Sequence, residues 1–192
     1  MAWIGGNYYL SQAEMEGNAR EIETYARSHG WTKNATAAIL GNMQAESGIN
    51  PGIWEMLNPY NGGYGLVQWT PYTKYSDWAT AQGYSWQNNG PAELDRISYE
   101  AANNLQWFYN AEIGANPPCT FEQFLKLNLY DLQTSTNLWL WFYEHPADPG
   151  PTTQAIRYGY AQSWYAFMSD WPDIGTLPAW LLFKFKDWRR WN

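Results

Sequence analysis

Residues 41–50 read GNMQAESGIN, a stretch that puts a glutamate where the pattern of its helix requires an apolar side chain. The residues that recur at spacings of three and four, and so share one face of that helix, are Ala35, Ala38, Ile39, Asn42, Met43 and Glu46. We expect Thr32 to cap this helix at its start and Ser47-Gly48 to end it. The helix therefore carries a carboxyl, Glu46, on the face that packs inward.

Glu46 is an unusual choice for that face for an energetic reason. Burying an ionised carboxylate is costly unless it is paired or protonated. Partial burial and the negative end of the helix dipole both favour the protonated form. A carboxyl that keeps its proton near the working pH is what a general acid requires. The alternative is a glutamate that points into solvent or pairs with a basic side chain.

Helical patterns cover most of the chain on both sides of this stretch. Ser11 and Glu14 have the spacing of a capping box and open a first helix within residues 10–31. The further predicted helices are 32–46, 92–113, a short one that begins at Thr120, 136–143, and 153–169 with Ile156, Tyr160, Trp164 and Phe167 on one face. Residues 49–91 are rich in Pro, Gly, Asn and Tyr, and GYGLVQWT at 63–70 is their one convincing strand. The sequence predicts a mainly helical domain with a small β or irregular region after the second helix.

Composition limits the functions that the chain can have. Its 192 residues include 14 Trp and 15 Tyr, and flat side chains with a polar edge suit amphipathic ligands such as sugars. A Trp-rich core is the alternative. The net charge of −7 argues against nucleic acid as a partner. The single cysteine, Cys119, excludes an internal disulfide and a cysteine-based metal site, and with only His29 and His145 we expect neither a metal nor a cofactor.

The end of the sequence differs from the rest in charge. The basic residues of this end are Lys184, Lys186, Arg189 and Arg190, and they are interleaved with Trp and Phe. Such mixtures are typical of segments that lie at anionic membrane surfaces, and docking on the acidic body or on another subunit is the alternative. We therefore divide the chain into a domain at 1–170 and a basic aromatic tail at 171–192. Within the tail, residues 178–192 are the segment expected to contact a membrane or an anionic wall polymer.

The stretches NMQAESGINPG at 42–52 and GYGLVQWTP at 63–71 together resemble the phage tail lysozyme family, within the lysozyme-like superfamily. These are wall-degrading domains of small tailed phages. The resemblance extends over roughly residues 10–170, and FYEHP at 142–146 is similar to a further element of the family. It implies an α+β lysozyme-like fold with a catalytic cleft between the helices and the β region. It also implies that Glu46 is the catalytic acid at the edge of the cleft and that bacterial peptidoglycan is the substrate.

Under that resemblance the strand supplies contacts to the substrate. Alternation puts Tyr64, Gln68 and Thr70 on one face of the strand and Trp69 on the other, toward the core. If the first face lines the cleft, Gln68 can hydrogen-bond the N-acetyl group of a sugar. Tyr64 can then stack on a sugar ring, and Thr70 can help to hold a water. The alternative is a plain hairpin in which Gln68 is satisfied internally.

A glycosidase of the usual kind needs a second carboxyl group. Glu55, Asp77 and Glu144 are the candidates by neighbourhood, and none stands out from the sequence. Glu144 follows a buried helix, so we expect it to support the site by pairing with a basic group or capping the backbone. Several lysozyme-like families use one glutamate together with a positioned water or the acetamido oxygen of the substrate.

The expected activity is hydrolysis of the β-1,4 bonds between N-acetylmuramic acid and N-acetylglucosamine, with one glutamate as general acid. Glucosaminidase and lytic transglycosylase chemistry stay open, as does the choice between a lysin in the phage tail and a free endolysin in the host cytoplasm before lysis. Two alternatives come from other classes of protein. One is a non-catalytic module that binds wall glycan, and the other is a membrane-active lysis protein that acts through its tail.

Overall fold

The computed structural model describes residues 2–172, and this part of the chain is mainly helical. Its α-helices are α1 (Gln12–Ser28), α2 (Lys33–Ser47), α3 (Thr73–Ala81), α4 (Gly90–Ala102), α5 (Phe121–Lys126), α6 (Leu132–Trp139) and α7 (Pro151–Phe167). A short 3₁₀ turn, η1 (Glu55–Leu57), follows α2, and a π-helical turn, η2 (Leu140–Glu144), continues α6. The expected mainly helical, lysozyme-like class is confirmed.

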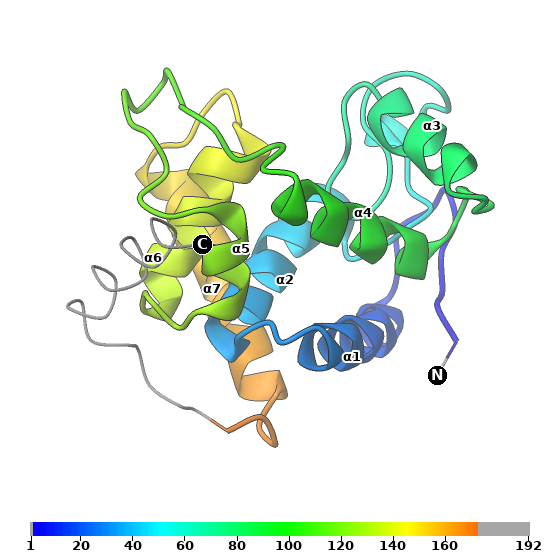
Figure 1. The fold of residues 1–192 in the computed structure, drawn as a ribbon. Helices are drawn as coiled ribbons and strands as arrows, with labels where there is room; N and C mark the ends of the chain where they lie inside the picture. The colour runs from blue at the N-terminus through cyan, green and yellow to red at the C-terminus, as the bar shows by residue number, and fades with distance from the viewer. Residues whose placement is uncertain (1, 173–192) are drawn as a thin grey trace, which may run out of the picture.

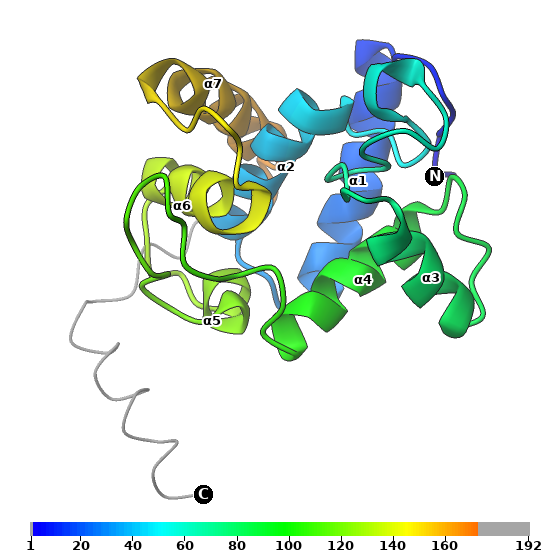
Figure 2. The same cartoon turned by 90° about the horizontal axis from the view of Figure 1, so that it is seen from above.

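Helix α2 runs through the middle of the molecule and separates two groups of elements (Figures 1 and 2). On one side, α6 and α7 pack against α2 and against each other. On the other side lie α1, the irregular segment after α2, and the paired helices α3 and α4. Because α2 packs on both sides, an unbroken run of its residues, from Asn34 to Met43, is buried.

The predicted signals at the ends of α1 and α2 are confirmed. Ser11 and Glu14 form the capping box of α1, with the Glu14 carboxylate accepting hydrogen bonds from the Ser11 N–H and hydroxyl. The Thr32 hydroxyl accepts the N–H of Ala35 at the start of α2. Gly48, with a φ of 61°, ends α2 in the left-handed conformation that glycine tolerates best. These caps fix the place of the last turn of α2 and therefore of Glu46.

Two predicted elements differ from the structure, and one helix was not predicted. Residues 63–70 form turns with isolated bridges, from Tyr64 to both Trp54 and Trp69, so the predicted strand is wrong. The helix predicted over 92–113 ends at Ala102, because Asn103 and Asn104 leave helical geometry. Helix α3 was not predicted, because its short sequence lies in a region dominated by turn residues.

The inward face of α7 also differs from its prediction. The spacing predicts that Ile156 and Trp164 share the buried face, but Ile156 is 50% exposed. The buried residues are Arg157, Ala161 and Trp164. An arginine thus occupies the first inward position of the helix, where an apolar residue was expected.

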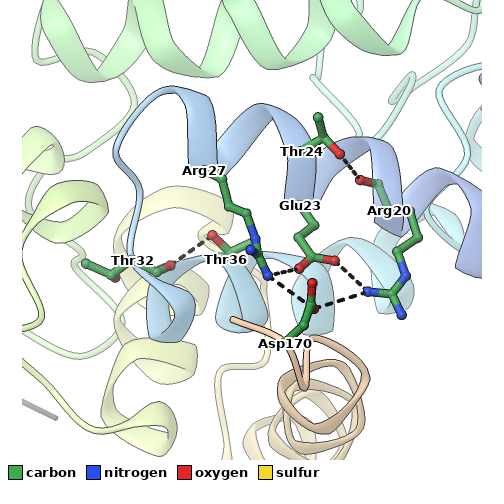
Figure 3. Close-up of polar contacts among 7 residues, drawn as sticks. All are labelled: Arg20, Glu23, Thr24, Arg27, Thr32, Thr36 and Asp170. Carbon is green, nitrogen blue, oxygen red and sulfur yellow. Dashed lines mark hydrogen bonds and ion pairs between the residues drawn. The ribbon is translucent and has the colours of Figure 1, made fainter. Parts of the chain in front are cut away.

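A cluster of charges joins the end of the α7 segment to α1 (Figure 3). Glu23, which is 4% exposed, accepts hydrogen bonds from Arg20 at 2.8 Å and Arg27 at 2.7 Å. Both arginines also face Asp170. The cluster holds the last described residues against α1. From residue 173 on, the predicted basic tail lies outside the described residues, and the division at residue 170 stays a prediction. In the described part, no helix combines the length and apolar character needed to cross a membrane.

Candidate active site

A cavity of about 710 Å³ lies at the C-terminal end of α2. Ala45 and Glu46 of α2 contribute to its lining. From the irregular region and α3 come Ile53, Trp54, Glu55, Met56, Val67, Gln68, Trp69, Thr70 and Lys74, together with Tyr9 from the N-terminal segment. From the far side of α2 come Gln106, Phe108, Tyr143, Glu144, His145 and Pro146. The cavity therefore lies between the two groups of helices, as the resemblance implies for a cleft.

Glu46 does not stand alone on the buried face of α2. Its carboxylate accepts a hydrogen bond from the guanidinium of Arg157, which reaches it from α7. A second nitrogen of Arg157 donates to the side-chain oxygen of Asn42, one turn before Glu46, at 3.0 Å. The Arg157 side chain is buried, whereas 22% of the Glu46 side chain is exposed toward the cavity. The ion pair favours the charged form of Glu46 and opposes the effect of partial burial.

A glycine allows α7 to come close enough for that pair to form. A Cβ atom on Gly41 would lie 2.7 Å from both the Ala161 nitrogen and the Arg157 carbonyl oxygen. These are backbone atoms, so they cannot turn away as a side chain does. The α2–α7 crossing therefore depends on a hydrogen atom at position 41. The close contact at Gly41 brings α7, and with it Arg157, against α2.

The polar residues that follow Glu46 attach the irregular region to α2. The Ser47 hydroxyl lies 2.9 Å from the Leu66 carbonyl oxygen and 3.0 Å from that of Met43. Asn50 is fully buried, and its amide nitrogen donates to the carbonyl oxygens of Gly6 and Tyr8 in the N-terminal segment. The Ser47 and Asn50 contacts fix one wall of the cavity relative to Glu46.

Gln68 and Thr70 line the cavity, as the sequence predicts, but on turns and not on a strand. The Gln68 amide nitrogen donates to the Gly65 carbonyl at 2.9 Å and to that of Ile53 at 3.3 Å. The Thr70 hydroxyl donates to the Gln68 carbonyl at 3.0 Å. The alternative prediction was that Gln68 forms its hydrogen bonds within the protein. This holds for its amide nitrogen, while the side chain still lines the cavity.

Tyr64 lies in the core and not on the cavity wall. It is 2% exposed, and its ring lies 4.7 Å from that of Trp54 and 5.1 Å from that of Trp86. Its hydroxyl accepts the N–H of Asn88. The expected stacking of Tyr64 on a sugar is therefore wrong, because the turn conformation removes the alternation on which it depended.

Of the three candidate second carboxyls, Glu55 and Glu144 line the cavity, and Asp77 is exposed outside it. Glu55 accepts the N–H of Gly63 at 3.0 Å. Glu144 accepts the indole N–H of Trp139 at 2.6 Å. Burial raises the pKa of Glu144 well above its usual value, and the nearby charge of Glu46 raises it further, against the opposing charge of Arg157. Burial and the charge of Glu46 therefore both favour the protonated form of Glu144.

A buried carboxylate connects the two walls of the cavity from beneath. Glu100 of α4 is 1% exposed and accepts hydrogen bonds from the Trp69 indole at 3.1 Å and the Tyr143 hydroxyl at 2.6 Å. Arg96 supplies the compensating charge at 2.8 Å. Trp69 and Tyr143 come from opposite sides of the cavity, so Glu100 fixes the distance between those sides. Sequence spacing placed Trp69 toward the core, and its 3% exposure agrees with that.

Four residues that line this cavity have a strained backbone. The residues with a positive φ that line it are Met56, Gln68, Gln106 and His145, with φ between 50° and 54°. None is a glycine, and such conformations cost about 1–3 kcal/mol each. Met56 is also 88% exposed, so burial of its own side chain does not offset that strain. Strain of this kind is typical of functional sites.

Several residues of the site could not be identified from sequence. Four of them lie on elements far from Glu46 along the chain, and no local motif joins them to it. They are Glu100, Lys74, His145 and Arg157. One signal was available, because Arg157 lies at helical spacing from Ala161, Trp164 and Met168. These residues are more buried than the predicted face, which was Ile156, Tyr160, Trp164 and Phe167. Within residues 2–172, no group of three or more His, Cys, Asp or Glu side chains is arranged to hold a metal ion.

Known proteins are similar to this sequence over most of its length. A sequence profile of the phage tail lysozymes matches residues 17–168. Morphogenesis protein 1 of Bacillus phage B103 is 42% identical over 161 residues, which cover 83% of this chain. The matched region is 41% of that phage protein, so this chain spans about two fifths of the relative's length.

Proposed function

This chain belongs to the phage tail lysozyme family, and from that premise we propose that it hydrolyses the glycan strand of bacterial peptidoglycan with Glu46 as general acid. The family supports a lysozyme-like activity against the cell wall in general. The finer assignment is carried by one observation, which is the position of Glu46. It lies at the end of a buried helix, partly exposed to a large cavity and paired with a buried arginine.

In the proposed reaction, the Glu46 carboxyl donates its proton to the glycosidic oxygen as the bond from that oxygen to the anomeric carbon breaks. The bonding electrons stay on the leaving oxygen, which departs as a hydroxyl group. The oxygen of a water, or first the acetamido oxygen of the substrate, forms the new bond to the anomeric carbon. The Glu46 carboxylate takes up the proton lost by the water, which restores the starting state.

Donation requires a protonated Glu46, although Arg157 favours the charged form. A substrate that fills the cavity excludes water, and desolvation favours the neutral form of a carboxyl. Glu144 contributes to the same balance of charge at the site. When Glu144 is protonated, only one carboxylate, that of Glu46, faces Arg157 and not two. We therefore assign Glu144 a supporting role, as the sequence predicts, through its protonated side chain and not through an ion pair of its own.

Gln68 and Thr70 are the proposed substrate contacts on the opposite wall. The Gln68 amide nitrogen is engaged by two carbonyl oxygens, so its amide oxygen is the atom that can accept the N–H of an N-acetyl group. The Thr70 hydroxyl donates to Gln68 and can accept from a water or a sugar hydroxyl. Tyr64 is not proposed, because it is buried.

The phage family and the name of the B103 relative, a morphogenesis protein, favour a place in the virion over a free endolysin. We propose that this chain acts on the wall from the phage tail. The role of the basic tail as a membrane or wall contact also stays a proposal.

Product analysis tests the reaction class. Purified Gram-positive walls are digested, the new ends are reduced with borohydride, and the fragments are identified by mass spectrometry. We expect reduced N-acetylmuramic acid ends for the muramidase reaction. Reduced N-acetylglucosamine ends would indicate a glucosaminidase, and 1,6-anhydro ends a transglycosylase. Binding to walls without new sugar ends would overturn the proposal and favour a glycan-binding module.

A further inference from the structure

The cavity contains a cationic side chain that the reaction does not use. Among the described residues that line the cavity, Lys74 is the only lysine or arginine. It lies in the first turn of α3 and is exposed. The positive end of the α3 dipole adds to its charge. Lys74 therefore presents a positive charge to whatever enters the cavity.

A second basic group faces the same space from the other wall. His145 ends η2, and its ring stacks on Phe108 with centroids 4.4 Å apart. Its Nε2 atom lies 3.1 Å from the Phe142 carbonyl oxygen, which fixes the ring in place. Partial burial lowers the pKa of His145, and the positive charge of Lys74 lowers it further. Lys74 and His145 are thus near enough to repel each other when both are charged.

The carboxyl groups that line the cavity engage other partners than Lys74 and His145. Glu46 pairs with Arg157, Glu55 accepts the Gly63 N–H, and Glu144 accepts the Trp139 indole. The ion pairs found among residues 2–172 give Lys74 no partner of its own. An anion placed between Lys74 and His145 would convert their repulsion into two attractions.

We propose that Lys74 and His145 bind a carboxylate of the peptide stem that branches from the glycan strand beside the cleaved bond. The inference rests on the proposed function, because it takes peptidoglycan as the substrate. The sugars of the strand are neutral, and the peptides joined to its muramic acid residues carry carboxylates. Lys74 and His145 lie at one part of the cavity, whereas Glu46, Glu55 and Glu144 lie elsewhere in it. A carboxylate bound by the two basic residues therefore fixes which way the stem points. The protein would then prefer strands whose stems carry free carboxylates over strands whose stem carboxylates are blocked as amides.

The expected size of the effect follows from the exposure of Lys74. A partly exposed ion pair contributes about 0.2–1 kcal/mol, which corresponds to roughly a 1.5- to 5-fold change in binding. Reversing the charge at residue 74 replaces attraction by repulsion, which doubles the change in binding free energy. Lys74→Ala should therefore reduce the preference for strands with free stem carboxylates about threefold, and Lys74→Glu by about tenfold.

The first test compares two substrates. One is purified glycan strands whose stems carry free carboxylates, and the other is the same strands after carbodiimide coupling has converted the stem carboxylates to amides. The measured quantity is the ratio of kcat/KM on the two substrates for the wild type, Lys74→Ala, Lys74→Glu and the control Lys126→Ala. Lys126 is a lysine of α5 that pairs with Glu122 and does not line the cavity. The ratio should fall in the two Lys74 variants and stay at the wild-type value in the control.

A ratio that Lys74 substitution leaves unchanged overturns the inference while the proposed function stands. Failure of the wild type to cut either substrate overturns the proposed function itself. The two failures are therefore distinguishable in one experiment.

The second test reads binding directly at His145 by NMR in the catalytically inactive Glu46→Gln protein. The probe is a disaccharide peptide with a free stem carboxylate, and its amidated form is the matched control. A bound carboxylate favours the imidazolium, so the pKa of His145 should rise with the free acid alone. His29, an exposed residue at the end of α1, serves as internal reference. An unchanged His145, or an equal rise with a glycerol phosphate polymer, contradicts recognition of the stem.

Discussion

At the scale of single residues, the site depends on how one arginine affects one glutamate. Arg157 holds Glu46 in place through a pair that also engages Asn42. The same positive charge favours the ionised carboxylate, which cannot donate a proton. Position and protonation of Glu46 therefore make opposite demands on Arg157.

Arg157→Gln should test the positioning role. The amide can still donate one hydrogen bond toward Asn42 or Glu46, but it cannot engage both as the guanidinium does. We expect kcat/KM on purified walls to fall by roughly ten- to a hundredfold, because the position of Glu46 is less fixed. Arg20→Gln in the remote cluster of Figure 3 is the charge-matched control and should keep the wild-type rate. An Arg157→Gln protein that is as active as the wild type contradicts this role.

At the scale of helices, the close contact of α2 with α7 brings Arg157 to the site. Gly41→Ala inserts a methyl group 2.7 Å from two backbone atoms of α7. Such overpacking typically costs about 1–3 kcal/mol of unfolding free energy, and activity should fall with it because the helices move apart. The matched control is Gly159→Ala, a glycine of α7 whose added Cβ meets nothing within 4 Å. That control should be stabilised by up to about 1 kcal/mol. Urea unfolding of both variants checks the prediction, and a Gly41→Ala protein as stable as the wild type refutes it.

The helices also show which signals in the sequence were reliable. The caps Ser11, Thr32 and Gly48 were predicted correctly, because a cap depends on a few neighbouring residues. The strand at 63–70 was predicted wrongly, because positive φ values at Gly65 and Gln68 turn the chain where alternation assumes it is extended. Leu105 and Phe108 keep helical spacing beyond Ala102, but they are 41% and 52% exposed. Spacing alone could not show that Asn103 and Asn104 end that helix.

At the scale of the whole molecule, the cavity draws residues from Tyr9 to Pro146, and Arg157 supports it from behind. The stretches at 42–52 and 63–71 were sufficient to identify the family and the proposed acid, because each is a short local motif. The opposite wall, the buried Glu100 beneath it and the pair of Lys74 and His145 depend on how distant segments pack. A single sequence contains no direct record of that packing, so these groups became visible only in the structure.

The central claim is that Glu46 supplies the proton for cleavage of the glycan strand. The measurement that tests it most directly is the initial rate of reducing-end release from purified walls by the wild type, Glu46→Gln and Glu55→Gln. Glu55 lies on the same cavity, so its variant controls for the loss of a carboxylate there. Circular dichroism establishes that each variant is folded. We predict that Glu46→Gln lowers the rate by roughly a hundredfold or more, the scale expected for a general acid, while Glu55→Gln stays within about fivefold of the wild type. A folded Glu46→Gln protein that releases reducing ends at the wild-type rate would contradict the account.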